Sequence, residues 1–208
     1  FTARVNNDVT INEYLSASLD VSFMRSLKTD ASRNPTLWDL HKASPVYPAV
    51  WDDGRLAPGK GGHNIYGQVK YGGDRKDWYN RIMGKASIDF TPFDGLKFSA
   101  IIAPSYGFDK GKDFLKAVET TIYEDPTVSG GTLQWFPSTS LTERRIDNYS
   151  VTAQFLTNYN KSFGDHNLNL LGGYEYYYGR YESLGASRDQ YPLTSYPYLD
   201  IGPLAYRD

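Results

Sequence analysis

Apolar and polar residues alternate one by one along several stretches of this sequence, and this period of two constrains the fold more than any other feature. From Arg81 to Phe90, even-numbered positions read Ile, Gly, Ala, Ile and Phe, and odd-numbered ones read Arg, Met, Lys, Ser and Asp. Successive side chains of a strand point to opposite faces of its sheet, so the pattern predicts a strand with one apolar and one polar face. Helical periodicity is hard to find, because even its best short candidate, residues 114–118, lacks a sustained apolar stripe.

The alternating runs come in pairs joined by short turns. After Phe90, a turn at residues 91–95 containing Pro and Gly leads into a second alternating run, residues 96–103, which predicts a β-hairpin. Runs at 149–156 and 167–178, around a turn at 160–166, predict another hairpin. Near the start, we expect a tight polar turn at Asn6, Asn7 and Asp8, between a short lead-in and a run at 14–23.

Short and long connectors alternate along the chain. Long connectors are expected at residues 27–77, at residues 107–143 and from residue 181 onward. In a meander this order puts the short turns at one end of the sheet and the long connectors at the other, as in outer-membrane barrels. The sequence therefore predicts an all-β fold: an antiparallel meander of about six strands, part of a large outer-membrane β-barrel with long extracellular loops.

Aromatic residues are placed as a lipid-facing surface requires. Aromatic side chains near the short turns are Phe90, Phe93, Phe98, Tyr159 and Phe163, and those toward the long connectors are Tyr106, Tyr149, Tyr174, Tyr176 and Tyr178. Small and aliphatic residues lie between the two groups, as in the membrane band of a barrel. The alternative is a soluble carbohydrate-binding β-sandwich, which would bury Ile88, Ile102, Val151 and Leu170 between two sheets.

Composition narrows the classes of function. The chain has no Cys, which excludes disulfides, thiolate zinc sites, iron–sulfur clusters and a Cys nucleophile. Its net charge of −2 does not favour a nucleic-acid binder. His41, His63 and His166 lack metal-ligand spacing. We therefore expect no metal, no cofactor and no enzymatic activity, although a glycan-cleaving enzyme with two facing carboxylates stays a second alternative.

Two further segments resemble ligand loops only in part. Residues 54–60 match the spacing of a phosphate loop, but Gly61 stands where that motif needs Ser or Thr, so we expect a flexible surface loop. Residues 109–113 resemble a calcium loop that lacks the central Gly and the terminal Glu, which favours a solvated turn.

Two sets of residues are candidates for functional contacts. The polar strand positions, which a barrel would direct into its lumen, are Asp20, Arg81, Lys85, Asp89, Gln154, Asn169 and Glu175. Aromatic residues in or beside the long connectors could stack on sugars or anchor a partner protein, although we expect most of them to pack the loops together; they are Trp38, Tyr47, Trp51, Tyr66, Tyr71, Trp78, Trp135 and Phe136.

Several short segments, in this order, carry a family resemblance. They are Arg4-Val5-Asn6-Asn7-Asp8 followed by Ile11-Asn12, Pro45-Val46-Tyr47-Pro48-Ala49 leading to Asp53-Gly54, Gly72-Gly73, the turn from Pro92 to Leu96, Gly164-Asp165-His166-Asn167-Leu168, and Gly172-Gly173-Tyr174-Glu175. With these segments the chain resembles the barrel region of SusC/RagA-type TonB-dependent transporters, the nutrient importers in the outer membrane of Bacteroides-like Gram-negative bacteria.

The resemblance implies properties that the residues alone do not give. It implies a large barrel with an N-terminal plug domain, coupling to TonB through an N-terminal region, and a SusD-like surface lipoprotein as partner. It also implies uptake of oligosaccharides or peptides across the lipid bilayer. Residues 1–208 would then be part of the barrel domain, with the plug and the remaining strands outside this sequence.

Overall fold

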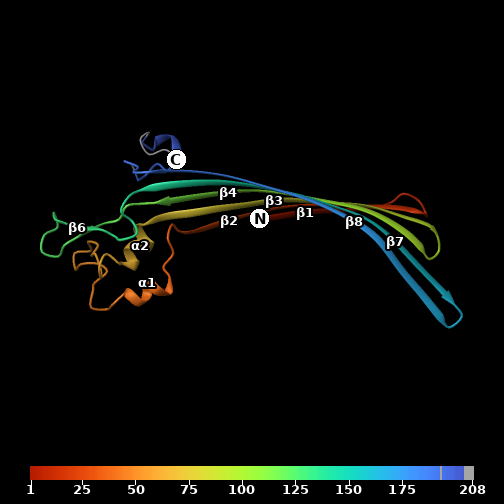
Figure 1. Ribbon diagram of the computed structural model, residues 1–208, viewed down its shortest axis with the longest axis horizontal. Helices are drawn as coiled ribbons and strands as arrows, with labels where there is room; N and C mark the ends of the chain where they lie inside the picture. Colours follow the sequence, from red (N-terminus) through yellow and green to blue (C-terminus); the bar gives the residue numbers. More distant parts are fainter. Residues whose placement is uncertain (193, 204–208) are drawn as a thin grey trace. The chain divides into compact units, whose positions relative to one another are not determined.

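The fold is all-β, and its main element is one six-stranded sheet (Figure 1). The computed structural model describes residues 1–192 and 194–203. The sheet has the order β1-β2-β3-β4-β7-β8, and its strands are β1 (Thr2–Thr10), β2 (Leu15–Ala31), β3 (Gly73–Phe93), β4 (Leu96–Leu115), β7 (Ser140–Phe163) and β8 (His166–Asp189). Each strand of this sheet pairs with the strands that precede and follow it along the chain. Only β5 (Glu119–Thr121) and β6 (Ser129–Thr132), which lie between β4 and β7 in the described sequence, form a separate two-stranded sheet. The predicted meander is therefore confirmed.

The alternation of short and long connectors is also confirmed, but the strands are longer than predicted. β3 and β4 are joined at Asp94–Gly95, and β7 and β8 at Gly164–Asp165, so both turns are tighter than the expected segments 91–95 and 160–166. Gly95 has φ +92°, and a Cβ there would lie 2.2 Å from the carbonyl oxygen of Asn160, so the turn requires glycine. The long connectors shrink to residues 32–72 and 116–139 because strand pairing continues beyond the clean alternation.

The first hairpin corrects one prediction. Asn6, Asn7 and Asp8 do not form a turn; they lie inside β1 and pair with Asp20, Leu19 and Ser18 of β2. The turn lies instead at residues 11–14, where the Asn12 side-chain oxygen accepts a hydrogen bond from the Tyr14 amide over 2.8 Å. Asn12 thus supplies the local hydrogen bond that a polar turn residue offers. Residues 109–113, predicted as a solvated turn, likewise lie inside β4.

The chain divides into two units. The strand unit comprises Phe1–Ser26, Tyr79–Asp109 and Ile146–Ser183, and the loop unit comprises Leu27–Trp78, Lys110–Arg145 and the part from Leu184 onward. All buried apolar side chains of the described residues belong to the loop unit; they are Ala57, Phe114, Val118, Leu133, Phe136, Leu141 and Tyr191. The strand unit is a sheet without a buried core of its own.

The loop unit contains two short helices that the sequence analysis did not predict. α1 (Leu37–Lys42) begins with a capping box, in which Thr36 and Asp39 hydrogen-bond each other's backbone and side chain. α2 (Ile65–Tyr71) begins at Asn64, whose side-chain oxygen accepts a hydrogen bond from the Gly67 amide. A 3-10 helix, η1 (Leu199–Ile201), follows β8. Helices this short depend on their caps and contacts, because isolated helices need about 12–15 residues.

Two small hydrophobic clusters hold the loop unit together. Val118, Leu133 and Phe136 are packed with Leu56 and Leu115 of neighbouring segments. Phe114, Leu141 and Tyr191 form the second cluster, against which Leu199 of η1 packs. Since these clusters draw on both long connectors and on strand ends, the connectors form one ordered substructure.

Asn64 is the polar centre of this substructure, which gives the first prediction. Its buried amide nitrogen donates to the carbonyl oxygens of Ala49 and Ala57, both over 2.6 Å. Asn64→Ala removes the cap and the side-chain donor to both carbonyls, of which only that of Ala49 keeps a backbone donor, the Ala57 amide. We therefore expect the opening free energy of amides in residues 49–71 to fall by about 1–3 kcal/mol. Native-state hydrogen exchange measures this.

The matched control is Asn12→Ala, which removes one exposed hydrogen bond in the β1–β2 turn. It should leave exchange in residues 49–71 unchanged. Equal protection of these amides in the Asn64→Ala variant and the unsubstituted protein would contradict the assigned role of Asn64.

Candidate functional site

One face of the strand unit carries a row of phenylalanines across three strands. The ring of Phe98 on β4 stacks on Phe90 of β3 at 6.5 Å and on Phe155 of β7 at 6.1 Å, with interplanar angles of 19° and 23°. Phe90 and Phe98 were predicted in the aromatic group near the short turns, and Phe155 of β7 is a further member that the prediction did not name. These stacked rings form one aromatic row across the sheet.

A second aromatic row lies further along the same face. Tyr149 of β7 lies 6.3 Å from Tyr178 of β8, and the Tyr106 hydroxyl of β4 donates to Asp147 over 2.6 Å. Tyr106 follows Phe98 by eight residues, which corresponds to about 27 Å of strand at about 3.4 Å per residue. Strands tilted by roughly 40° would bring the two rows about 20 Å apart along a membrane normal, close to the apolar band of about 25 Å in outer-membrane barrels.

The apolar residues between the rows are uncovered. Ile88 is 54% exposed, Ile102 50% and Leu170 54%, and Val151 is partly exposed. A sandwich would bury these four side chains between two sheets, but the described part of the strand unit contains one sheet layer. Neighbouring positions on this face are also exposed, and with those above they give a continuous surface, hereafter the apolar face: Val5, Val9, Leu19, Val21, Ile82, Tyr174 and Tyr176.

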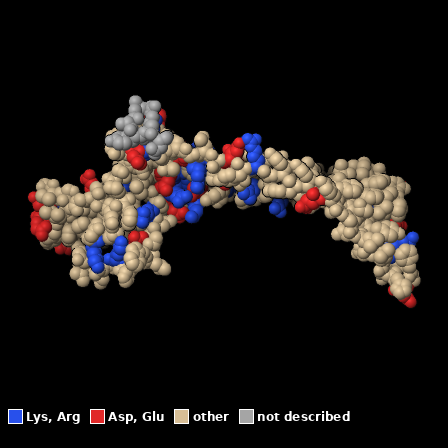
Figure 2. Space-filling model, viewed as in Figure 1, with Lys and Arg blue, Asp and Glu red and all other residues tan. Residues whose placement is uncertain are grey.

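The opposite face of the strand unit carries the polar strand positions, several of which are paired, and also the exposed apolar side chains of Met83 and Leu171. Asp89 accepts a hydrogen bond from Ser99 at 2.5 Å and pairs with the ammonium of Lys97 at 2.9 Å. The Gln154 amide donates to Glu175 over 2.5 Å. In the view of Figure 2, which shows the molecule from one side, acidic and basic groups lie beside one another. On this face one carboxylate is thus neutralised by a lysine, and another accepts a hydrogen bond from a neutral amide.

The seven polar positions predicted for this face do share it. Asp20 and Lys85 line one hollow together with Arg4 and Asn6, and Ser18 and Ser87 of the same strands meet at 2.6 Å. By the alternation along each strand, Arg81 shares the side of Lys85 and Asp89, and Asn169 shares the side of Glu175. Whether this side faces a barrel lumen stays a prediction.

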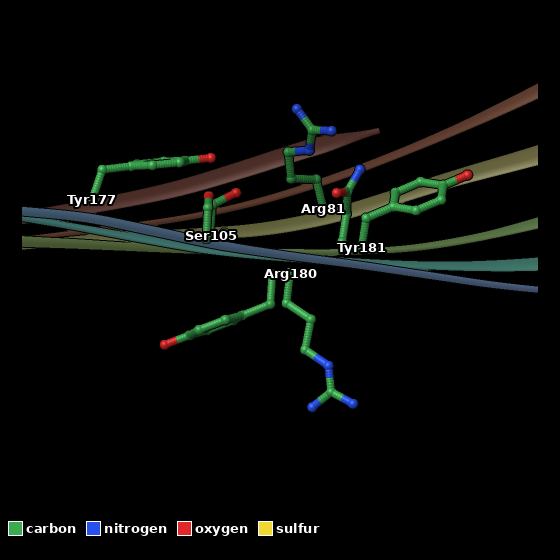
Figure 3. Close-up of a pocket in the computed structure, with 9 residues that line it drawn as sticks. Arg81, Ser105, Tyr177, Arg180 and Tyr181 are labelled. Carbon is green, nitrogen blue, oxygen red and sulfur yellow. The ribbon is translucent and has the colours of Figure 1, made fainter.

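A second hollow on the polar face contains tyrosines that the sequence analysis did not select. Arg81, Ser105, Tyr177 and Tyr181 point to one side of the strands, and Arg180 points to the other (Figure 3). Tyr177 and Tyr181 are exposed. Both tyrosines have odd numbers like Glu175, so the sequence does place them on the same face of β8. Nothing in the sequence distinguishes them from the other tyrosines of this strand as candidates for a binding site.

The loop aromatics divide into packed and exposed groups. Phe136 is only 1% exposed and belongs to the loop core, so it is not available to a ligand. Trp51 donates its indole N–H to the Thr121 carbonyl over 2.8 Å. Trp78 lies within β3 rather than in a connector, because this strand begins already at Gly73, and the ammonium of Lys110 lies 5.4 Å from its ring centre. The packing expectation is confirmed for Phe136 and Trp51.

The remaining loop aromatics contact neighbouring side chains but keep much of their surface exposed. Trp38 on α1 is 66% exposed, and four others have two-fifths to half of their surface exposed: Tyr47, Tyr66, Tyr71 and Trp135. Their neighbours are other rings and cations: Tyr66 and Tyr71 meet edge to face at 6.3 Å, and Trp38 stacks on His41 at 5.8 Å. The ammonium of Lys70 contacts the Tyr66 hydroxyl at 2.5 Å, and the Arg33 guanidinium lies 4.4 Å from the Trp135 ring centre. A binding role for these exposed rings stays a prediction.

Two of the exposed tyrosines share a hollow of about 280 Å³, here called the loop groove. Its apolar wall contains Pro45, Tyr47, Pro48, Ile65 and Tyr66, and its polar side chains are Lys42, Lys60, His63, Ser44 and Asn64. The sequence analysis placed Tyr47 and Tyr66 among the candidates, but it missed the lysines, because only the fold of residues 42–66 brings them to these rings.

The polar end of the loop groove is electropositive. Lys42 Nζ lies 3.2 Å from His63 Nε2. Burial, and secondly the charge of Lys42, lower the pKa of His63. Beneath them Asp39 is buried in the α1 cap, where hydrogen bonds from the Thr36 backbone and side chain lower the pKa of its carboxyl. Arg33 is also close enough to affect both groups.

Other kinds of site find no support in the described residues. In 1–192 and 194–203 there is no group of three His, Asp or Glu side chains placed to hold a metal ion. None of the helices within these ranges has the length and apolar character needed to cross a bilayer.

The phosphate-loop-like segment, residues 54–60, is held by contacts of Arg55. This residue pairs with Asp53 at 2.5 Å and donates to the Ile122 carbonyl at 2.8 Å.

Comparison of the sequence with protein-family models and with curated proteins gives no match. The function is therefore inferred from the residues and their geometry, together with the family resemblance of the short segments.

The groove electrostatics give a second prediction. Lys42→Met should raise the pKa of His63 toward its ordinary value of 6.5 without reaching it, because burial remains. NMR titration of the His63 ring measures this. Lys70→Met, which removes an ammonium bonded to Tyr66 rather than to His63, should leave that pKa unchanged. If the pKa of His63 is the same in the Lys42→Met variant as in the unsubstituted protein, the assigned contact between Lys42 and His63 is contradicted.

Proposed function

We propose that this chain is a segment of the barrel wall of an outer-membrane nutrient importer of the SusC/RagA-type, TonB-dependent class. The proposal places it in the outer membrane of a Gram-negative, Bacteroides-like bacterium. The importer takes up glycans or peptides and works with a SusD-like surface lipoprotein. TonB acts through an N-terminal region outside this sequence.

The observation that carries this proposal is the exposed apolar face of the strand unit. Keeping apolar surface in water costs about 25 cal/mol per Å², and soluble monomers rarely expose continuous apolar patches larger than a few hundred Å². Lipid removes this cost without a second protein layer. The aromatic rows at either end of the apolar face fit the two membrane interfaces, where amphipathic rings are favoured.

The polar face supports the same assignment. In large barrels the strand side opposite to lipid lines a polar interior. Here it carries paired groups, such as Asp89 with Lys97 and Gln154 with Glu175. Two faces of such different polarity on one sheet suit a wall between hydrocarbon and water.

The sheet edges also fit a segment of a larger wall. In the described residues, β1 and β8 are edge strands, each paired on one side only. Long unpaired edges invite pairing with further strands, and a barrel removes them by closure. The proposal therefore requires additional strands of the complete protein beside β1 and β8.

A charge placed on the apolar face tests this function. Ala153→Arg puts a guanidinium at mid-bilayer depth in β7, which should cost about 2–4 kcal/mol and block insertion. Gln154→Arg is the matched control, because its neighbouring position lies on the polar face beside Glu175. We expect the control, but not Ala153→Arg, to reach the outer membrane in cell fractionation.

Normal assembly of both variants would contradict the membrane assignment. Recovery of the unsubstituted protein in a soluble fraction, with its glycan binding intact, would favour the carbohydrate-binding module instead.

A further inference from the structure

The loop groove combines flat apolar surface with unneutralised positive charge. Tyr47 and Tyr66 are half-exposed at its rim. Lys42 and Lys60 are among its lining residues, and no carboxylate is. Within residues 1–192 and 194–203, neither lysine forms a salt bridge, unlike Lys76, Lys97 and Lys112.

The surroundings increase this positive character. Arg33 also forms no salt bridge in the described part of the chain, and its Nε atom is buried without a hydrogen-bond partner. The one carboxylate beside the groove, Asp39, is 4% exposed and accepts its hydrogen bonds from Thr36. Three basic side chains of this region thus form no salt bridge within the described residues, and basic side chains gather over the loop segments beside α1 in Figure 2.

We propose that the loop groove binds a carboxylated sugar ring, so that the ligand is an acidic, uronic-acid-containing oligosaccharide. The ring packs against Tyr47 and Tyr66, whose faces are apolar and whose hydroxyls can hydrogen-bond. Its carboxylate accepts charge-assisted hydrogen bonds from Lys42 and Lys60. The hollow of about 280 Å³ is at the lower end of the ligand-pocket range of about 300–1,000 Å³, so it holds one ring of a longer chain.

This inference rests on the proposed function and specifies its substrate class. A glycan is favoured over an acidic peptide because two rigid aromatic rings and two prolines line the wall, which suits a flat ring better than a flexible side chain. A neutral glycan would leave both ammonium groups of the groove without a carboxylate partner.

Calorimetry on the complete protein in detergent tests the proposal with tetragalacturonate and its methyl ester as probes. The acid should bind more tightly than the ester, and increasing salt should weaken only the acid. Lys42→Gln with Lys60→Gln should reduce acid affinity about tenfold or more, since two charge-assisted hydrogen bonds are lost. Ester affinity should be unchanged in that variant.

Three variants complete the design. Lys161→Gln, in β7 outside the groove, is the matched lysine control and should bind like the unsubstituted protein. Lys42→Arg with Lys60→Arg should retain acid binding, and Tyr66→Ala should weaken both probes. Any one of three results would overturn the proposal. The double Gln variant could bind tetragalacturonate as tightly as the unsubstituted protein, or the protein could bind acid and ester equally well. The third result is that tetraglutamate binds more tightly than tetragalacturonate and depends on the same lysines.

These outcomes are separate from the test of the proposed function. A protein that inserts into the outer membrane but shows no lysine-dependent binding contradicts only the substrate class. Failure of the unsubstituted protein to reach the outer membrane contradicts the importer itself.

Discussion

The strand unit depends on one constraint: a single sheet satisfies its backbone hydrogen bonds but leaves two faces, and here one of them is apolar and uncovered. Ile88, Ile102 and Leu170 keep about half of their surface exposed, with stacked phenylalanines on one side and tyrosines on the other. In water this surface would drive association or collapse. In hydrocarbon it requires no cover, so the proposed membrane position accounts for a sheet that has no core.

The loop unit, unlike the strand unit, buries apolar side chains of its own. Its connectors are too long to be left unsupported, and they form small cores around Phe136 and Phe114 with Asn64 as a buried polar link. This local order holds the exposed Tyr47 and Tyr66 against the lysines of the loop groove. Under the proposed function, the two units separate two physical tasks: the strand unit contacts hydrocarbon, and the loop unit binds a polar ligand.

The features that depend on the alternation of apolar and polar residues could be predicted from the sequence. The features that depend on contacts between distant residues could not. Strand identity, the meander and the two faces followed from alternation, because side-chain direction in a strand depends on parity alone. The turn at Asn6 to Asp8 was misplaced, since polar residues in an edge strand resemble a turn while Asn12 supplies the actual one. The short helices and the loop groove were missed because caps and packing, rather than an apolar stripe, create them.

The most direct measurement of the central claim is solvent accessibility along β7. Spin labels attached to single cysteines at positions 150–155 of the complete protein, in a membrane and with any other cysteine removed, report collisions with oxygen and with a water-soluble nickel complex. We predict period-two alternation, with oxygen favoured at Val151, Ala153 and Phe155 and nickel at Ser150, Thr152 and Gln154. Low accessibility to both reagents at Val151, Ala153 and Phe155 would contradict the account, because it would place the apolar face inside protein.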